Sequence, residues 1–309
     1  MLFGAFNNFE YDRFFILYGI DFLILLFSKG CGMLSNNLAT GGKNMITNKH
    51  KDIIINKYTN YDEDLRLTKD RAHNIEYLTT MHYIQKFLKP GAKILEVGAA
   101  TGRYSLTLAK MGYDVTAVDL VPRYVEIMKK KGRRLKNFKC MIADALDLSA
   151  FKDNSFDIVL NFGPMYHMFH QKNKEQVVKE TLRVAKKNAV CMFAYLSHAS
   201  LITGYALSAG KSVLTRMVSL MDKTGRIKDT PEEVFASFYI EDFKKLFAKT
   251  KTTYIKNVAV DGIALAMREW IQQLSKKDYQ SFLNWHFMTC ERPDQQGFSS
   301  HLLYICKKK

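Results

Sequence analysis

The stretch from Glu96 to Gly102 (EVGAATG) places an acidic residue and two glycines at the end of an apolar run. A strand that turns at glycine into a helix presents backbone N–H groups at the helix N-terminus, where a charged ligand can bind. A nicotinamide dinucleotide fingerprint requires glycine at the first, third and sixth positions of such a turn. Those positions are Gly98, Ala100 and Arg103 here, so the pattern fails twice. The carboxylate of Glu96 suits a ligand with an amino group.

Two further acidic residues follow the next two apolar runs. Asp119 ends the run that begins at residue 114, and Asp144 follows the run 138–142. Asp119 lies about 20 residues beyond Gly98, a spacing from which a carboxylate can accept both hydroxyl protons of a ribose. Taken singly, the glycines could form a tight turn and the aspartates could cap helices. Their recurrence at successive strand ends favours one shared site.

Apolar runs and helical patterns alternate along most of the chain, which is typical of a parallel sheet covered by helices on both faces. Right-handed crossovers would bring the carboxyl ends of the strands to one edge, where ligands bind. We therefore predict an α/β fold, a Rossmann-like doubly wound sheet of seven strands with an inserted helical lid. The predicted strands are 92–97, 114–118, 138–142, 156–160, 189–195, 253–260 and 301–306, and the predicted helices are 61–88, 104–110, a segment that starts at Pro122, and 175–187.

These motifs resemble those of the class I S-adenosylmethionine-dependent methyltransferases, over residues 61–309. Residues 96–102, 115–119, 143–145 and 160–163 match successive motifs of that family. Ala100 replaces the usual central glycine, and Lys187-Asn188-Ala189 replaces the common Pro-Gly-Gly. The tail at 289–292 and 300–301 is similar to that of bacterial members of unassigned substrate. The resemblance implies that S-adenosyl-L-methionine is the cofactor and that its binding residues are Glu96, Gly98, Ala100, Gly102, Asp119, Leu120, Asp144, Ala145, Asn161 and Gly163.

The stretch 160–170 (LNFGPMYHMFH) holds two of the eight histidines of the chain, after a predicted strand. His167 and Tyr166 are the candidates for a catalytic base or for groups that orient the acceptor. In the alternative interpretation Tyr166 packs a helix and His167 is a partly buried histidine. Positioning of an acceptor can supply roughly 7–11 kcal/mol, and a base adds about 10²–10⁴-fold. A base is therefore needed only where the acceptor atom is protonated.

The same stretch excludes several chemistries. Asn161-Phe162-Gly163-Pro164 does not match the Asn/Asp-Pro-Pro-Tyr/Phe motif that holds an extruded base in enzymes that methylate nucleic-acid amino groups. No Pro-Cys pair offers a thiolate for attack on cytosine. The five cysteines have no zinc-site spacing, and no carboxylate cluster resembles the magnesium-dependent catechol type. We expect no metal.

Polar residues elsewhere could also face the acceptor. His73 and Glu76 lie three residues apart, so they share one face of the first predicted helix and could line the pocket as a hydrogen-bonded pair. The alternative is a solvated charged face. In the tail, Glu291 could form a surface pair with Arg292. The candidates for substrate contact are Arg66, His73, Tyr195, Arg292 and His301.

The net charge of +16 comes largely from scattered lysines. The densest run, residues 129–136, closes a predicted helix, where cations interact favourably with the helix dipole. The charge still supports an anionic macromolecular partner as an alternative. Cys140, Cys191 and Cys306 fall in apolar strand patterns, which is typical of buried, reduced thiols in a cytoplasmic protein.

The N-terminal segment is interpreted separately. Phe14 to Phe27 is apolar, but it is shorter than the ~20 residues of a membrane span and contains Asp21. Gly41-Gly42-Lys43-Asn44 can be encoded by a bacterial ribosome-binding sequence ahead of Met45. Our hypothesis is that translation starts at Met45 and that residues 1–44 are upstream sequence, which leaves no membrane partner. A membrane-anchored form is the alternative.

The predictions divide the rest of the chain into a cap helix (45–90), a cofactor-binding core (91–196), a helical lid (197–251) and a C-terminal completion of the sheet (252–309). Because an enclosed pocket excludes water and suits a small ligand, the lid favours methyl transfer by in-line displacement to a small or medium-sized acceptor. One alternative is a methyltransferase that acts on RNA or a ribosomal protein. Another is a non-catalytic cofactor-binding interaction module.

Overall fold

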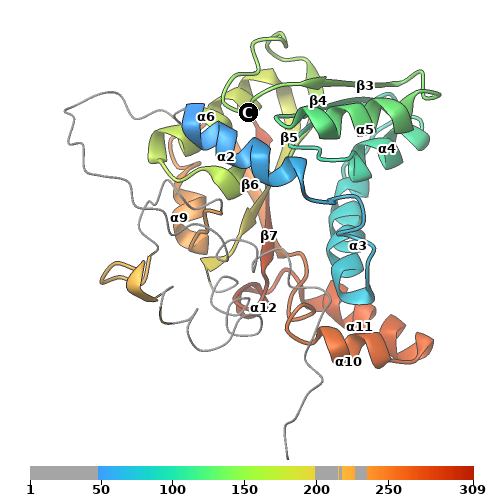
Figure 1. Cartoon of the computed structure of the whole chain (residues 1–309), viewed down its shortest axis with the longest axis vertical. Coiled ribbons are helices and arrows are strands. Elements are labelled where there is room, and N and C mark those ends of the chain that lie inside the picture. The colour runs from blue at the N-terminus through green and yellow to red at the C-terminus, as the bar shows by residue number, and fades with distance from the viewer. Residues whose placement is uncertain (1–47, 199–214, 216–217, 227–234) are drawn as a thin grey trace, which may run out of the picture.

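The computed structural model describes residues 48–198, 215, 218–226 and 235–309 (Figure 1). The hypotheses about residues 1–44 and Met45 lie outside the described residues, as do residues 199–214, 216–217 and 227–234 of the predicted lid. In the part that is described, no helix combines the length and apolar character needed to cross a membrane.

Seven strands form one sheet in the order β3-β2-β1-β4-β5-β7-β6. Strands β1 to β5 are parallel, whereas β7 runs antiparallel to both of its neighbours, β5 and β6. The predicted α/β fold with seven strands is confirmed, although the sheet is mixed at this edge. The strands are β1 (Lys93–Val97), β2 (Asp114–Asp119), β3 (Phe138–Ile142), β4 (Phe156–Asn161), β5 (Ala185–Leu196), β6 (Thr252–Ala259) and β7 (His301–Lys308).

The central strands are buried on both faces. Ile94 and Leu95 follow one another in β1 and so point to opposite faces of the sheet, yet neither exposes any of its surface. Helices must therefore cover both faces, which explains why such strands are almost continuously apolar. The helices of the sheet region are α4 (Arg103–Lys110), α5 (Pro122–Gly132), the short 3₁₀ helix η1 (Pro164–His167), α6 (Gln171–Val184) and α9 (Ile240–Lys245).

The N-terminal region differs from the single helix predicted over 61–88. It forms two helices, α2 (Asn48–Thr59) and α3 (Arg71–Gln85), joined by a turn segment. The cause is Asp70, whose side chain accepts a hydrogen bond from the backbone N–H of His73 and so starts α3 at Arg71. Residues 60–70 are consequently free of helical geometry and can bring Glu63 and Arg66 toward the sheet.

The C-terminal region contains helices that the sequence patterns did not predict. Between β6 and β7 the chain forms α10 (Arg268–Gln273), α11 (Lys276–Thr289) and α12 (Pro293–Gln296). Figure 1 shows α10 and α11 at the lower end of α3. Ile75 of α3 packs there in one buried cluster with Ile271 and Leu283. The helices between β6 and β7 thus hold the lower end of α3 in Figure 1, while its other end lies toward the sheet.

The sheet order places the site. The chain runs from β1 outward to β2 and β3, and then returns to β4 on the other side of β1. At such a switch point the loops at the carboxyl ends of the two central strands lead away in opposite directions and leave a crevice.

Candidate functional site

A cavity occupies this crevice, and it is lined by segments that lie far apart in the sequence. The ends of β1 and β2 and the segments after β3 and β4 form one side of the cavity. Residues of α2, α3, the turn between them, η1 and the first residue of β7 form the other side. We call Glu96, Asp119 and Asp144 the carboxylate end of the cavity. We call Arg66, Glu76 and His301 the ion-pair end, together with Asp261, which binds His301 but does not itself line the cavity.

Glu96 is the deepest acid of the carboxylate end. It is only 1% exposed, and it accepts a hydrogen bond from the Ser105 hydroxyl. Burial raises the pKa of Glu96 to about 8, so the carboxyl holds a proton over much of the neutral range. Among the described residues, none forms an ion pair with it. A cationic ligand group in the cavity would favour its ionised form.

Asp119 is held in place by the backbone. Its Oδ2 accepts a hydrogen bond from the N–H of Ala100 at 2.7 Å, and its Oδ1 accepts one from the N–H of Val121 at 2.8 Å. Burial nevertheless raises the pKa of Asp119 to about 6, which leaves the carboxylate ionised at neutral pH. A rigid, ionised carboxylate at this position can accept further hydrogen bonds from a ligand.

The turn after β1 approaches the loop after β4 closely. A Cβ atom on Gly98 would lie 2.5 Å from Cδ of Pro164 and 2.6 Å from the carbonyl oxygen of Phe162. Gly98 also has φ of +78°, a left-handed conformation that favours glycine. Ala100, which replaces the usual glycine of the motif, has φ of +47° and contributes the N–H that binds Asp119.

Asp144, the third acid, forms an ion pair with Lys51 at 2.5 Å. Lys51 belongs to α2, and this helix also contributes Ile54 and Tyr58 to the cavity wall. The cap helix therefore contacts the carboxylate end directly, and Lys51 has to turn aside if a ligand is to reach Asp144.

Eight of the ten residues expected to bind the cofactor line the cavity, and two do not. Gly102 lies behind the turn, where an added Cβ would meet Cγ of Met128 at 2.9 Å; its role is to let α4 pack closely on α5. Asn161 is fully buried and donates to the Thr181 hydroxyl at 3.1 Å. Thr181 belongs to α6, so the Asn161 side chain lies on the face of the sheet that this helix covers. The eight are Glu96, Gly98, Ala100, Asp119, Leu120, Asp144, Ala145 and Gly163.

At the ion-pair end, Arg66 binds two acids. It donates to both oxygens of Glu76, at 2.7 and 2.9 Å, and it also binds Glu63. Burial alone would raise the pKa of Glu76, but Arg66 and His301 lower it to about 2. Burial raises the pKa of Glu63 above its ordinary value. One oxygen of Glu63 has no hydrogen-bond partner among the described residues.

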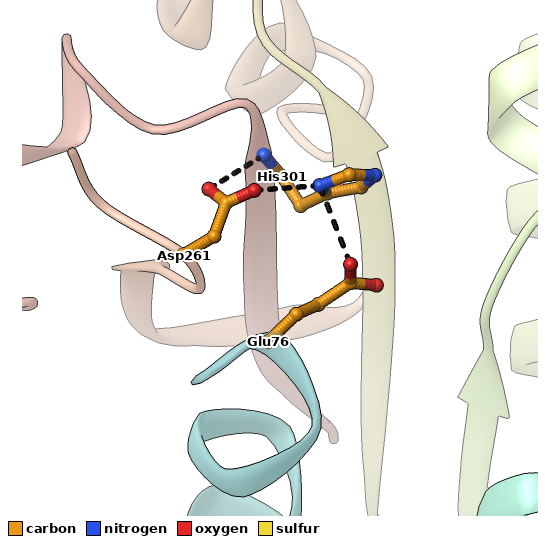
Figure 2. Close-up of side chains that lie close together, drawn as sticks. All are labelled: Glu76, Asp261 and His301. Atoms are coloured by element: carbon orange, nitrogen blue, oxygen red, sulfur yellow. Dashed lines mark hydrogen bonds and ion pairs between the residues drawn. The ribbon is translucent and has the colours of Figure 1, made fainter. Parts of the chain in front are cut away.

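His301 stands between two carboxylates (Figure 2). Its Nδ1 lies 2.8 Å from Oδ2 of Asp261 and 3.6 Å from Oε2 of Glu76. These three side chains come from β7, the segment after β6, and α3, and their ligand-capable atoms lie within 4.8 Å of one another. Burial lowers the pKa of His301, but the two carboxylates outweigh burial and raise it above its ordinary value.

Tyr166 and His167, the expected catalytic pair, both line the cavity. Nε2 of His167 lies 3.3 Å from the hydroxyl of Tyr58, and the His167 ring packs at a centroid distance of 5.5 Å from Phe235. Burial raises the pKa of the Tyr166 hydroxyl, which stays protonated. Since Nε2 of His167 already has a partner, His167 fits a packing and positioning role in the wall.

Three of the expected substrate contacts lie outside the cavity, whereas Arg66 and His301 line it. The His73 ring binds Asp70 at 2.8 Å instead of pairing with Glu76. Tyr195 is fully buried and stacks on Phe243, because the side chains of a strand alternate and its neighbour Ala194 faces the cavity. Arg292 is largely exposed and binds Asp294, not Glu291.

Sequence reasoning missed Tyr58, Glu63 and Asp261. Tyr58 and Glu63 belong to a region whose apolar residues show little helical periodicity, so no sequence pattern indicated that these side chains face the sheet. Asp261 had a detectable signal, because it is an acid just beyond a predicted strand and precedes Gly262, like the acids of the other strand ends.

Residues 95–193 match the family model described as a methyltransferase domain. The chain is 28% identical over 137 residues to the human "Probable tRNA methyltransferase 9B", a match that covers 40% of this chain and 28% of that protein. It is 30% identical over 108 residues to a demethylmenaquinone methyltransferase of Tropheryma whipplei, covering 35% of this chain and 43% of the relative. A demethylmenaquinone methyltransferase of Staphylococcus aureus is 27% identical over 190 residues, 60% of this chain and 61% of the relative.

Residues 95–193 thus form a methyltransferase domain, and the chain is similar to the class I S-adenosylmethionine-dependent methyltransferases. Each of these matches spans less than two thirds of the relative's own length. Among solved structures, the PH0226 protein of Pyrococcus horikoshii has the same fold, with a TM-score of 0.51 at 18% identity, over 81% of this chain and 100% of that chain. In this chain the matched region begins within β1, and the C-terminal strands β6 and β7 complete the sheet.

Proposed function

We propose that the protein transfers a methyl group from S-adenosylmethionine to a small or medium-sized acceptor bound at the ion-pair end of the cavity. The observation that carries this proposal is that the carboxylate end and the ion-pair end line the same cavity. A cofactor at the first end and an acceptor at the second would then share one cavity, which Gly98 and Tyr166 also line.

The carboxylate end fits the chemistry of this cofactor. Glu96 would hold the positively charged amino group, Asp119 would accept both ribose hydroxyls, and Asp144 would accept from the adenine amine. Asp119 is held by two backbone N–H groups and is therefore rigid before a ligand binds. Gly98 leaves space at the turn where a side chain would collide with Pro164.

The bound cofactor supplies an electrophilic methyl group, and the chain supplies position and a dry environment. Holding an acceptor in line with that methyl group is worth roughly 7–11 kcal/mol. Tyr58, Tyr166 and His167 line the wall of the cavity between α2 and η1. Their rings exclude water from the acceptor and so strengthen the interactions of the buried charges.

Calorimetric titration with S-adenosylmethionine tests the cofactor part. Asp119→Ala removes the charged acceptor for two hydroxyls, each worth about 1.5–3 kcal/mol, so affinity should fall by at least about 10²-fold. Glu126→Ala removes an acid from the exposed surface of α5 and should leave the affinity unchanged. Equal affinities of the two variants would contradict the assignment.

Transfer itself is tested with methyl-labelled cofactor and fractionated cell extract. Label in the small-molecule fraction would support the proposal. Label in RNA would instead support an RNA acceptor, the alternative that the net charge of +16 and the similarity to the human "Probable tRNA methyltransferase 9B" suggest. In that case binding should weaken steeply as salt rises. Tight cofactor binding without transfer to any fraction would favour a non-catalytic binding module.

A further inference from the structure

We propose that His301, oriented by Asp261, is the proton acceptor of the reaction and that the acceptor substrate is a phenol, an aromatic compound with a free hydroxyl. This inference rests on the proposed function and names the catalytic base and the substrate class of that site. It replaces His167 in the role for which the sequence made it a candidate.

The hydrogen bonds of Asp261 fix the orientation of His301. Oδ1 of Asp261 accepts three hydrogen bonds, from the Ser299 hydroxyl at 2.6 Å and from the backbone N–H groups of Ser300 and His301 at 2.9 and 3.1 Å. Its carboxylate cannot rotate without losing them. Oδ2 is left to face Nδ1 of His301 at 2.8 Å. The neutral imidazole therefore keeps its proton on Nδ1.

The other ring nitrogen is then free to accept a proton. Figure 2 shows Nε2 of His301 at the end of the ring opposite Asp261 and Glu76. His301 is 8% exposed and lines the cavity. Within the described part of the chain, Nε2 has no hydrogen-bond partner, whereas Nε2 of His167 faces Tyr58 and Nε2 of His286 faces Thr79. His301 thus presents an unpaired lone pair to the cavity.

The surrounding charges make this lone pair more basic. Glu76 from α3 and Asp261 from the segment after β6 raise the pKa of His301 and outweigh the opposing effect of burial. Arg66 acts in the opposite direction, from the turn before α3. Glu63 from the same turn interacts with His301 as well, and Tyr166 of η1 packs at a ring distance of 6.0 Å. The carboxylates would stabilise the imidazolium formed when the proton arrives.

A metal ion is a less suitable occupant of this cluster. Both oxygens of Glu76 already accept from Arg66, and the guanidinium would repel a cation placed beside Glu76. Asp261 has one oxygen bound by three donors and the other by His301. The carboxylates are thus engaged in positioning a histidine, and few of their lone pairs are open to a metal.

The cavity wall indicates the substrate class. Tyr58, Tyr104, Phe162 and Tyr166 line the same cavity as His301, and the Tyr166 ring lies 6.0 Å from the His301 ring; such aromatic surface suits a flat ring. One unpaired nitrogen offers one hydrogen-bond acceptor, which matches a single hydroxyl. Free phenols of the tyrosine type ionise near pH 10, so such an acceptor is protonated at neutral pH and needs a base.

The step balances without a further reactant. The O–H bond breaks and its proton moves to Nε2 of His301. The oxygen forms a bond to the methyl carbon, and the electron pair of the breaking C–S bond stays on sulfur. The products are the methyl ether, S-adenosylhomocysteine and an imidazolium that later releases its proton to solvent.

The first test is an NMR titration of the ring nitrogens in the full chain labelled with ¹⁵N, which needs no acceptor. We expect the neutral ring of His301 to carry its proton on Nδ1, with a pKa above the ordinary histidine value. Asp261→Asn should lower that pKa and allow the other tautomer. A proton on Nε2, or a pKa unchanged by Asp261→Asn, would overturn the proposal.

The second test compares phenol with 4-nitrophenol, which is largely ionised at mildly alkaline pH and needs no base. His301→Gln should reduce methylation of phenol by about 10²–10⁴-fold and leave methylation of 4-nitrophenol close to that of the parent chain. His82→Gln, a histidine outside the cavity, is the matched control and should change neither rate.

The remaining outcomes separate the two proposals. Equal losses with both phenols would assign His301 to structure, and methylation of neither phenol while an extract compound is methylated would overturn the substrate class. Zn²⁺ or Mg²⁺ binding that His301→Gln abolishes, together with metal-dependent turnover, would overturn the base assignment in favour of a metal. Failure of S-adenosylmethionine to bind the unmodified chain would instead contradict the proposed function itself.

Discussion

The two ends of the cavity are built in different ways. At the carboxylate end, Glu96, Asp119 and Asp144 stand at or just after the ends of three neighbouring parallel strands, and backbone N–H groups hold Asp119. At the ion-pair end, the residues come from α3, the turn before it, the segment after β6 and the start of β7, and contacts between charged side chains link Arg66 to Glu76 and His301 to Asp261. The first end follows from the sheet, whereas the second forms only when the N-terminal turn and α3 meet the segments near residues 261 and 301.

This difference predicts different responses to mutation. A residue held by the backbone can be replaced without leaving another charge unpaired. A residue held by a buried ion pair leaves its partner without compensation, and that is costly. The ion-pair end should therefore be the more fragile part of the fold, and the carboxylate end the more sensitive part of cofactor binding.

The largest effect is expected for Arg66→Met. This change leaves Glu76 and Glu63 buried without their shared cation, which should lower the free energy of unfolding by about 3–5 kcal/mol, measured by urea denaturation. Lys129→Met breaks an exposed pair with Glu126 and should cost less than about 1 kcal/mol. Similar losses of unfolding free energy in the two variants would contradict the expectation that the ion-pair end is the more fragile part of the fold.

The pH dependence of the same variant sharpens the test. The pKa of Glu76 is lowered in the folded chain to about 2, so the group stabilises the fold above its unfolded pKa, near 4.3. This contribution is lost as the pH falls from there toward 2. Arg66→Met should flatten the dependence of stability on pH in that range, and the double variant with Glu76→Gln should recover part of the lost stability.

The next effect concerns the turn that joins the two ends. In Gly98→Ala, alanine has to adopt a left-handed backbone conformation, which costs about 1–2 kcal/mol. Its Cβ also collides with Pro164 and Phe162, and such overpacking costs about 1–3 kcal/mol more. Gly91→Ala has a similar φ of +73° but open space around the new atom. We expect Gly98→Ala to lose more stability than Gly91→Ala by about 1–3 kcal/mol and also to weaken cofactor binding. Equal losses would show that close approach is unimportant here.

The same contrast explains how far the sequence could predict the molecule. Strands and their ends are visible in the local sequence. The seven strands could be located from their apolar runs, and the acids of the carboxylate end from their position at the ends of these runs. Side-chain direction was less certain: Asn161 and Tyr195 lie at strand ends, but each points to the face away from the cavity. A shift of one residue in a strand reverses its face.

The ion-pair end could not be assembled from sequence because its contacts are long-range. Arg66 and Glu76 are close in the chain, but nothing local indicates that Asp261 and His301 will meet them. The helices between β6 and β7, which hold α3 in place, also left no clear pattern. Their packing against Ile75 decides the position of Glu76 one residue later.

A smaller effect should appear in the pH dependence of cofactor binding. Burial raises the pKa of Glu96 to about 8, and a cationic amine would bind its ionised form. Affinity for S-adenosylmethionine should rise by about tenfold per pH unit below that pKa and level off above it. Binding below pH 8 should release a proton, which calorimetry in buffers of different ionisation enthalpy detects. Glu96→Gln should abolish both effects, and an unchanged pH profile in that variant would assign the dependence to another group.

The smallest effect separates two tyrosines that the sequence had grouped at the site. Tyr195→Phe removes a buried hydrogen bond to Asn257 of 3.1 Å and should lower stability by about 0.5–1.5 kcal/mol without changing cofactor affinity or methyl transfer. Tyr166→Phe removes a hydroxyl from the cavity wall and should alter transfer with little change in stability. The reverse pattern, slower transfer with Tyr195→Phe at unchanged cofactor affinity, would place that hydroxyl in the site. The ion-pair end would then extend along β5, and both faces of that strand would contribute to the site.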